Sequence, residues 1–259
     1  MVTNKNKTAL VIGHPGHELR VFRWLEIAKP DVFIITDGSG RSGDSRLAST
    51  SRLLPQTGCK EGTFYGDLSD AAAYAAILNH EFEVFIVLAR KLAEHLIARE
   101  ITCVAGDAWE GYNPVHDTCR AIINTAVEIA ARANHRVLNL SFPLIGPPEA
   151  CPNGNCDDAV HPELDDAAFA RKLAAARAYS ELESEVNEAI SQNQIEAFRI
   201  ECLRPVAAGP ANTELNEKPY YELYGERKVA SGHYSQVIRY REHFVPLAAA
   251  LWQTAVRRN

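Results

Sequence analysis

The feature that most constrains the fold is a short strand–helix–strand unit near the start of the chain. An apolar run at residues 9–12 ends in Gly13, and residues 31–36 form a second run of the same kind. Between them, residues 19–28 carry apolar side chains at helical spacing, and Pro30 closes that segment. Two strands joined through a helix in so short a span are parallel, with a right-handed crossover. The unit therefore predicts an open, parallel α/β sheet.

The rest of the chain repeats this alternation. We expect helices at 46–54 (ending before Pro55), 67–80, 82–96, 116–134, 164–198 and 245–256, and strands at 62–66, 101–105 and 136–140. Residues 84–88 also suit a strand, and either Asp67 or Ser69 suits the cap of the 67–80 helix. About five strands alternating with helices predict a Rossmann-like, three-layer α/β/α fold with a mostly parallel sheet.

The expected organisation is an α/β domain at residues 1–204 followed by a C-terminal extension at 205–259. The segment 205–218 is polar and contains Pro and Asn, as linkers do, and 145–160 is an irregular insert. The extension is rich in aromatic residues and ends in an apolar helix. We expect it to pack on the core or on a partner in a homo-oligomer.

Composition excludes several classes of function. The net charge of −6 gives no electrostatic case for nucleic-acid binding. No apolar run approaches the roughly 18 residues of a membrane span, and the opening MVTNKNK is too polar for a signal peptide. The six cysteines are expected to be reduced thiols of a cytoplasmic protein. Cys151 and Cys156 have the spacing of half a zinc knuckle, but no second pair follows.

Two histidines lie where the first strand ends, in the loop Gly13-His14-Pro15-Gly16-His17-Glu18. Ligands of open α/β sheets bind at such strand ends, and imidazoles at this spacing are candidate metal ligands. A single histidine in a loop is usually a polar surface residue without a specific role. The glycine-rich run 38–43 lacks the Lys-Ser/Thr of a phosphate-binding P-loop, so a mobile loop over the site is the better interpretation.

Two later motifs complete a recognisable pattern. Thr36-Asp37-Gly38 follows the second strand, and Asn113-Pro114-Val115-His116 opens a helix after a later strand. With the first loop, they resemble the PIG-L/LmbE-like family of zinc-dependent N-acetylglucosamine deacetylases. That family has A-H-P-D-D-E in its first loop, a T-D-G-like turn and a later H-P-D-H motif. The resemblance runs from about residue 8 to residue 200, and it implies a catalytic α/β domain over 1–204.

The resemblance implies a metal site of three histidines. His14 matches the family's first zinc ligand, His17 falls on its Asp ligand, and His116 matches the last His of H-P-D-H. Three histidines with an open fourth position make a sound catalytic zinc site, although another divalent metal is possible. Because one carboxylate ligand is lost, the metal keeps more positive charge, and a bound water should be more acidic.

The groups that assist the metal differ from the family pattern. Gly16 falls where the family has its general-base Asp, and Asn113 falls on the His thought to steady the oxyanion. Another carboxylate would have to take the proton. We expect Glu110 in the loop before His116, with Glu18 as a second choice.

Three further residues are expected to bind substrate or support the site. Arg46 matches a substrate-contacting Arg of the family, and Asp37 belongs to its T-D-G-like turn. Asp117 follows a ligand, where a partner for a ligand or a favourable helix-start charge is expected.

These residues support three functional hypotheses. The first is a zinc-dependent hydrolase that removes an N-acyl (acetyl) group from a small amino sugar or glycoconjugate. The second is a catalytically degenerate, sugar-binding or scaffold member of a glycan pathway that keeps the fold, with or without the metal. The third is a nucleotide- or cofactor-binding α/β protein without a metal, using the glycine-rich loops.

Overall fold

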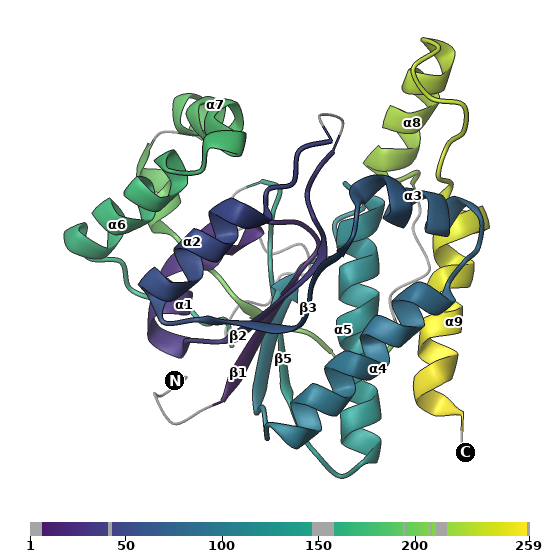
Figure 1. The fold of residues 1–259 in the computed structure, drawn as a ribbon, viewed down its shortest axis with the longest axis horizontal. Coiled ribbons are helices and arrows are strands. Elements are labelled where there is room, and N and C mark those ends of the chain that lie inside the picture. Colours follow the sequence, from purple (N-terminus) through teal and green to yellow (C-terminus); the bar gives the residue numbers. More distant parts are fainter. Residues whose placement is uncertain are drawn as a thin grey trace.

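The computed structural model describes residues 7–40, 43–146, 158–193, 195–207, 209–210 and 217–257. Cys151 and Cys156, with most of the expected insert, lie outside the described residues. Within the described part, the chain forms a sheet covered on both faces by helices (Figure 1). This architecture confirms the fold class expected from the sequence.

The described sheet has six strands in the order β3-β2-β1-β4-β5-β6, so β1 lies near its centre. Their bounds are β1 Thr8–Ile12, β2 Asp31–Thr36, β3 Lys60–Leu68, β4 Cys103–Asp107, β5 Leu138–Phe142 and β6 Arg204–Pro205. The first five are parallel, and β6 pairs antiparallel with β5. The chain order reverses between β1 and β4, which is the position where such sheets bind ligands.

Alternate residues of the central strand supply the two apolar layers. Ala9 and Val11 face one cluster of buried side chains, while Leu10 and Ile12 face the other. Because both faces are covered, the strand is apolar at every position and shows no alternation with polar residues. A continuous apolar run thus identified a central strand correctly.

Helices form the outer layers. Helices α3 (Asp70–Leu78), α4 (Glu83–Ala98), α5 (Pro114–Arg132) and α9 (Val245–Val256) cover one face. Helices α1 (Phe22–Ala28) and α2 (Leu47–Thr57) cover the other, with α6 (Asp166–Arg177) and α7 (Glu183–Asn193) further along the same side (Figure 1). Helix α8 (Tyr220–Ala230) stands at the end of the molecule where α3 also lies (Figure 1).

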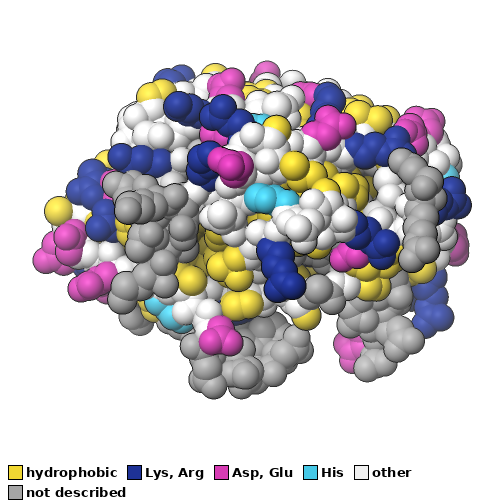
Figure 2. Space-filling view, turned by 90° about the horizontal axis from the view of Figure 1, so that it is seen from below, with side chains coloured by type: hydrophobic (Ala, Val, Ile, Leu, Met, Phe, Trp, Pro, Cys, Tyr) yellow, Lys and Arg dark blue, Asp and Glu magenta, His cyan; other side chains and the backbone are white. Residues whose placement is uncertain are grey.

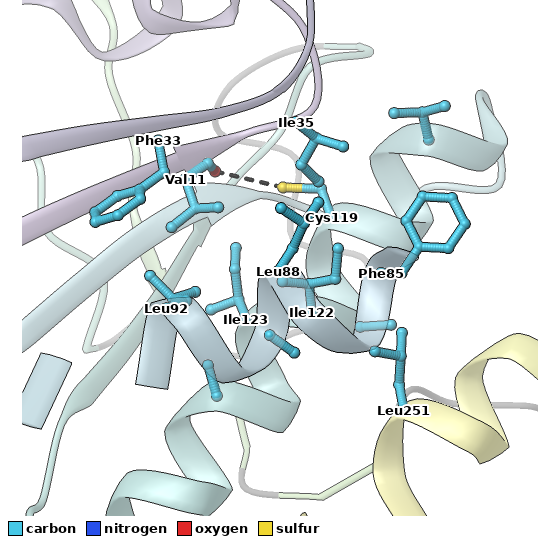
Figure 3. Packing of buried hydrophobic residues seen from close by; sticks show 14 of the residues in the cluster. Val11, Phe33, Ile35, Phe85, Leu88, Leu92, Cys119, Ile122, Ile123 and Leu251 are labelled. Atoms are coloured by element: carbon cyan, nitrogen blue, oxygen red, sulfur yellow. Dashed lines mark hydrogen bonds between the residues drawn. The ribbon is translucent and has the colours of Figure 1, made fainter. Parts of the chain in front are cut away.

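The last helix of the chain packs into the same core as the first strand. Figure 3 shows Leu251 of α9 beside residues of α4 and α5, and Cys119 of α5 donates its S–H to the Val11 carbonyl at 3.5 Å. Leu247 and Leu251 are completely buried. Residues 245–256 therefore stabilise the α4/α5 layer of this same chain.

Several element boundaries differ from the sequence expectation. Helix α2 runs through Pro55 and ends only at Gly58, which has a φ of 77° and donates its N–H to the last turn. Proline in the final turn costs one helical hydrogen bond, whereas a left-handed glycine is the usual end of a helix. The expected helix 164–198 is broken after Arg177 into α6, short 3₁₀ turns and α7.

The open alternatives are also resolved. Residues 84–88 are helical, inside α4. Ser69 caps α3 by accepting a hydrogen bond from the Ala72 N–H, so Asp67 is not the cap. Strands β4 and β5 each end two residues later than expected, at Asp107 and Phe142, and this shift matters for the site.

In the described part of the chain, no single helix is long and apolar enough to cross a membrane. Helices α3 and α4 reach that length only together, and they meet at a bend of 116°. On the face shown in Figure 2, acidic and basic side chains are intermixed, with hydrophobic side chains between them.

We predict that Leu251→Ala lowers the free energy of unfolding by about 2–5 kcal/mol, because it leaves a cavity in the shared core. Leu223→Ala, at a position that is 44% exposed on α8, is the matched control and should change it by less than about 1 kcal/mol. Urea unfolding measures both. Equal effects of the two substitutions would show that α9 does not stabilise the core.

Candidate active site

Three imidazole rings meet at the carboxyl end of the sheet. His14 and His17 follow β1, and His116 lies in the first turn of α5. The ring centres of His14 and His17 are 5.3 Å apart, those of His14 and His116 are 5.1 Å apart, and those of His17 and His116 are 4.5 Å apart. We call these three residues the imidazole cluster. The structure thus brings together the three histidines that the sequence singled out.

His14 is held by a buried carboxylate. Its Nδ1 lies 3.0 Å from Asp70 Oδ1 and 2.7 Å from Thr36 Oγ1. Burial opposes the ionisation of Asp70, but the hydrogen bond and charge of His14 lower the Asp70 pKa overall. Since an ionised carboxylate only accepts hydrogen bonds, Nδ1 carries the proton. The Nε2 atom of His14 is buried and has no hydrogen-bond partner among the described residues.

His17 is held in the same way by a second carboxylate. Its Nδ1 donates to Asp107 Oδ2 at 2.9 Å, and the same oxygen accepts the Gly13 N–H at 2.8 Å. Asp107 is completely buried at the end of β4. Burial lowers the pKa of His17, although Asp107 opposes this shift, so the ring is neutral at pH 7. With its hydrogen on Nδ1, the ring has its lone pair on Nε2.

His116 is buried and less constrained. Its Nδ1 has no hydrogen-bond partner in the described part of the chain. Burial and the neighbouring His17 and His14 lower its pKa well below the ordinary value. The lowered pKa values of His17 and His116 favour their neutral form, which is the protonation state in which histidine binds a metal.

The fit of a metal can be tested against this geometry. Three imidazoles on one tetrahedral zinc, with Zn–N bonds of about 2.1 Å, place their ring centres about 5 Å apart, and the observed spacings agree with this. In the part of the chain that is described, however, no group of three or more His, Cys, Asp or Glu side chains is arranged to hold a metal ion. The rings are gathered, while their role as ligands stays a prediction.

Asp70 and Asp107 were not assigned roles from the sequence. The expected strand 101–105 ended before Asp107, whereas β4 includes it and aims it at the loop after β1. Asp70 follows the cap of α3 and reaches His14 from 56 residues away along the chain. The sequence feature that could have identified Asp107 is its position as a carboxylate at the end of a parallel strand. No sequence feature pointed to Asp70.

Position 16 has no room for a side chain. Gly16 has a φ of 106°, a conformation that L residues rarely adopt, and a Cβ there would collide with Leu182. The Gly16 N–H donates to Glu18 Oε2 at 2.6 Å. The left-handed backbone of this loop therefore favours glycine over the family's carboxylate at position 16, and any side chain there would displace Leu182.

Glu110 is engaged in holding a loop. Its two carboxylate oxygens accept hydrogen bonds from the backbone N–H groups of Leu144 and Ile145, at 3.0 and 3.1 Å. Burial raises the pKa of Glu110, which these bonds oppose. The expected proton acceptor is thus bonded through both oxygens to the segment after β5, and its role in proton transfer stays a prediction.

Glu18 and Asp117 also bind backbone or neighbouring side chains. Glu18 is completely buried and accepts the Thr50 hydroxyl at 2.8 Å as well as the Gly16 N–H, and burial raises its pKa. Asp117 accepts the N–H groups of Glu110 and Gly111, and burial raises its pKa to about 8. Both residues shape the loops that surround the cluster.

Asn113 is the N-cap of α5. Its Oδ1 accepts the Val115 N–H at 2.8 Å, and its Nδ2 donates to the Tyr74 hydroxyl at 3.0 Å. An amide nitrogen carries two hydrogens, so one donor remains after the bond to Tyr74. The sequence expectation of a hydrogen-bond donor near His116 is compatible with this placement.

Asp37 and Arg46 lie in the loop after β2. Asp37 Oδ1 accepts the N–H groups of Ser39 and Asp70, so this carboxylate orders the turn beside the site. A Cβ placed on Gly40 would lie 4.0 Å from Arg46 Nη2 and 3.9 Å from Asp70 Oδ2. The Arg46 guanidinium therefore lies near Gly40, whose N–H donates to Asp70 Oδ2 at 2.7 Å.

Comparisons with known proteins show the fold. No family model matches the chain, and no curated protein sequence matches it. The solved structure of the A40926 pseudoaglycone deacetylase Dbv21 is similar, with a TM-score of 0.55 and 16% identity over 79% of this chain and 98% of that chain.

Two further solved structures are similar to the same degree. A deacetylase of teicoplanin biosynthesis matches with a TM-score of 0.53 and 15% identity, over 78% of this chain and 99% of that chain. The conserved protein TT1542 from Thermus thermophilus matches with a TM-score of 0.51 and 18% identity, over 79% of this chain and 96% of that chain. At these identities, the likeness shows a shared α/β fold.

We predict that Glu110→Ala speeds hydrogen exchange at the Leu144 amide about tenfold or more, because a buried N–H loses a charged acceptor. Exchange followed by NMR measures this rate. Glu94→Ala, at an exposed position on α4, should leave it unchanged. An unaltered Leu144 rate in Glu110→Ala would mean that Glu110 does not anchor this loop.

Proposed function

We propose that this chain is a metal-dependent hydrolase of the PIG-L/LmbE-like type, which removes an N-acyl group, acetyl in the simplest case, from an amino-sugar conjugate. The observation that carries the proposal is the way His14 and His17 are held. Each donates Nδ1–H to a buried aspartate, which leaves its Nε2 lone pair for another partner. Carboxylate–histidine pairs of this kind orient the ligands of catalytic zinc sites.

His14, His17 and His116 would hold the metal, with zinc as the expected ion. Bound there, zinc would polarise the amide carbonyl and lower the pKa of a water molecule to about 7. A histidine-only site leaves this positive charge uncompensated by a ligand carboxylate. For that reason, a metal-bound water could still serve as the nucleophile although Gly16 replaces the carboxylate of the family's general base.

The chain's own residues would complete the chemistry. Asp70 and Asp107 act as positioning residues, because they fix the tautomer and orientation of His14 and His17. Asn113 has one free amide hydrogen beside the start of α5, where it would donate to the developing oxyanion. Glu18, Glu110 and Asp117 keep the surrounding loops in shape.

The substrate class follows from the neighbours and from the site. Two of the structurally similar proteins are described as deacetylases, of A40926 pseudoaglycone and of the teicoplanin pathway. Arg46 lies near Gly40, and Asp37 accepts the N–H of Asp70, the residue that holds His14, so the loop after β2 offers polar groups that suit the hydroxyls of a sugar. A small polar conjugate therefore fits this loop-built site better than an apolar ligand.

We predict that protein purified without chelator carries about one zinc, or another divalent metal, per chain. Each of the substitutions His14→Ala, His17→Ala and His116→Ala should remove it, since each deletes a ligand. Elemental analysis by mass spectrometry measures the metal content.

His233→Ala, at an exposed position on the segment after α8, is the control and should keep the full metal content. Metal-free wild-type protein that takes up no zinc on titration would overturn the metal proposal. Normal zinc binding by the variant in which His14, His17 and His116 are all replaced by Ala would overturn it as well.

We predict that Asp107→Asn lowers metal affinity or the rate of acetyl removal about 10–100-fold, because the His17 Nδ1–H loses its charged acceptor. Release of free amine from N-acetylglucosamine and its conjugates measures the rate, and competition with a zinc chelator measures the affinity.

Glu110→Gln separates the two roles considered for Glu110. Anchoring of the loop by this residue predicts that turnover persists at a reduced level, while a role as the essential proton acceptor predicts its loss. Zinc-loaded wild-type protein that releases no amine from any of these conjugates would count against a hydrolase.

A further inference from the structure

Four tyrosines form a continuous row outside the imidazole cluster. The rings of Tyr112 and Tyr220 stack at 4.8 Å with 3° between their planes, and those of Tyr220 and Tyr224 stack at 6.0 Å. Tyr224 meets Tyr234 edge to face at 6.4 Å. We call Tyr112, Tyr220, Tyr224 and Tyr234 the tyrosine ladder.

The ladder starts at the candidate active site. Tyr112 lies in the loop between β4 and α5, and its ring is 6.5 Å from that of His116, with 29° between their planes. Helix α8 is fastened to this loop, since the Tyr221 N–H donates to the Gly111 carbonyl at 3.3 Å. The rest of the ladder therefore leads outward from His116 along α8.

Three of the four ladder rings are exposed although they are aromatic, and Tyr224 is half-buried. Tyr112 is 40% exposed, Tyr220 44% and Tyr234 40%. Exposed apolar residues usually occur singly on a protein surface, and a contiguous set marks a binding site. Tyr221, the neighbour on α8, is by contrast buried in the core, so the helix turns one tyrosine inward and two outward.

Cationic side chains lie over two of the rings. The Arg227 guanidinium lies 5.7 Å from the centre of the Tyr220 ring, and the Lys228 ammonium lies 5.1 Å from that of Tyr224. The surface thus combines flat apolar faces with phenol hydroxyls and N–H donors. Amphipathic aromatic rings with polar groups at their edges suit a ligand that has both C–H faces and hydroxyl groups.

We propose that the tyrosine ladder is a second sugar-binding subsite, which binds the pyranose ring next to the N-acylated sugar. This inference rests on the proposed function and narrows its substrate to a glycoside of at least two rings. The C–H face of a pyranose would pack on Tyr220 and Tyr224, and its hydroxyls would bond Arg227 and Lys228. Because the ladder begins beside His116, a substrate bound at the candidate active site would extend onto these rings. We therefore take the substrate, and not a separate ligand, to be what the ladder binds.

The test compares N-acetylglucosamine with N,N′-diacetylchitobiose, which carries one additional ring. Wild-type protein should bind the disaccharide more tightly, and Tyr220→Ala and Tyr224→Ala should each weaken that binding about 3–10-fold. Both variants should leave the affinity for the monosaccharide unchanged. Tyr220→Phe keeps the ring and should retain most of the preference, and Leu223→Ala on the same helix is the control.

Calorimetry or ligand-observed NMR on metal-free protein provides a readout that does not depend on activity, and melting temperatures check that each variant is folded. A disaccharide preference that is absent in wild type, or that survives both alanine variants, overturns the subsite. Loss of the preference in the alanine variants supports it even where no amine is released. Suppose that the protein releases amine but that both alanine variants keep the disaccharide preference: this result contradicts the subsite and not the hydrolase. If the ladder is needed for disaccharide binding but the protein holds no metal and shows no turnover, the hydrolase is contradicted and the subsite is not.

Discussion

The buried carboxylate of Asp107 is the constraint on which the site depends. It joins the ends of two neighbouring parallel strands, because one oxygen accepts both the Gly13 N–H after β1 and the His17 Nδ1–H beyond it. Strands β1 and β4 must lie close for this bond, and Gly106 permits it, since a Cβ at that position would collide with the Val11 backbone. The sheet register and the orientation of His17 are therefore set by the same group.

The fold and the two histidines of the first loop were predictable because they depend on local pattern. Buried parallel strands appear as apolar runs, and their carboxyl ends meet at one edge of the sheet, so the placement of His14 and His17 follows from where β1 ends. His116 was singled out by the resemblance of residues 113–116 to a family motif. Asp70 was not predictable, because its contact with His14 spans 56 residues and is made by the approach of α3. No spacing within a single motif contains that information.

The roles of the acidic loop residues show where reading a motif is insufficient. Glu18, Glu110 and Asp117 all lie next to candidate ligands, which is where a catalytic carboxylate would also be found. In the structure, each accepts at least one backbone N–H: Glu18 that of Gly16, Asp117 that of Glu110, and Glu110 that of Leu144. Loops that surround a buried site need such acceptors. Proximity in the sequence to a ligand therefore predicts loop anchoring as readily as catalysis.

The C-terminal extension links stability to the shape of the site. Helix α9 places Leu247 and Leu251 in the main core, while the N-terminus of α8 is bonded to the loop that holds Tyr112. Helix α9 is packed against α4 and α5, and the start of α8 is bonded to the loop before α5. The segment that joins α8 to α9 is therefore fixed at both ends, and α8 is held over the carboxyl end of the sheet. A rigid support of this kind lowers the entropic cost of binding a ligand to exposed rings. The same extension thus completes the hydrophobic core and supplies the aromatic surface that lies next to His116.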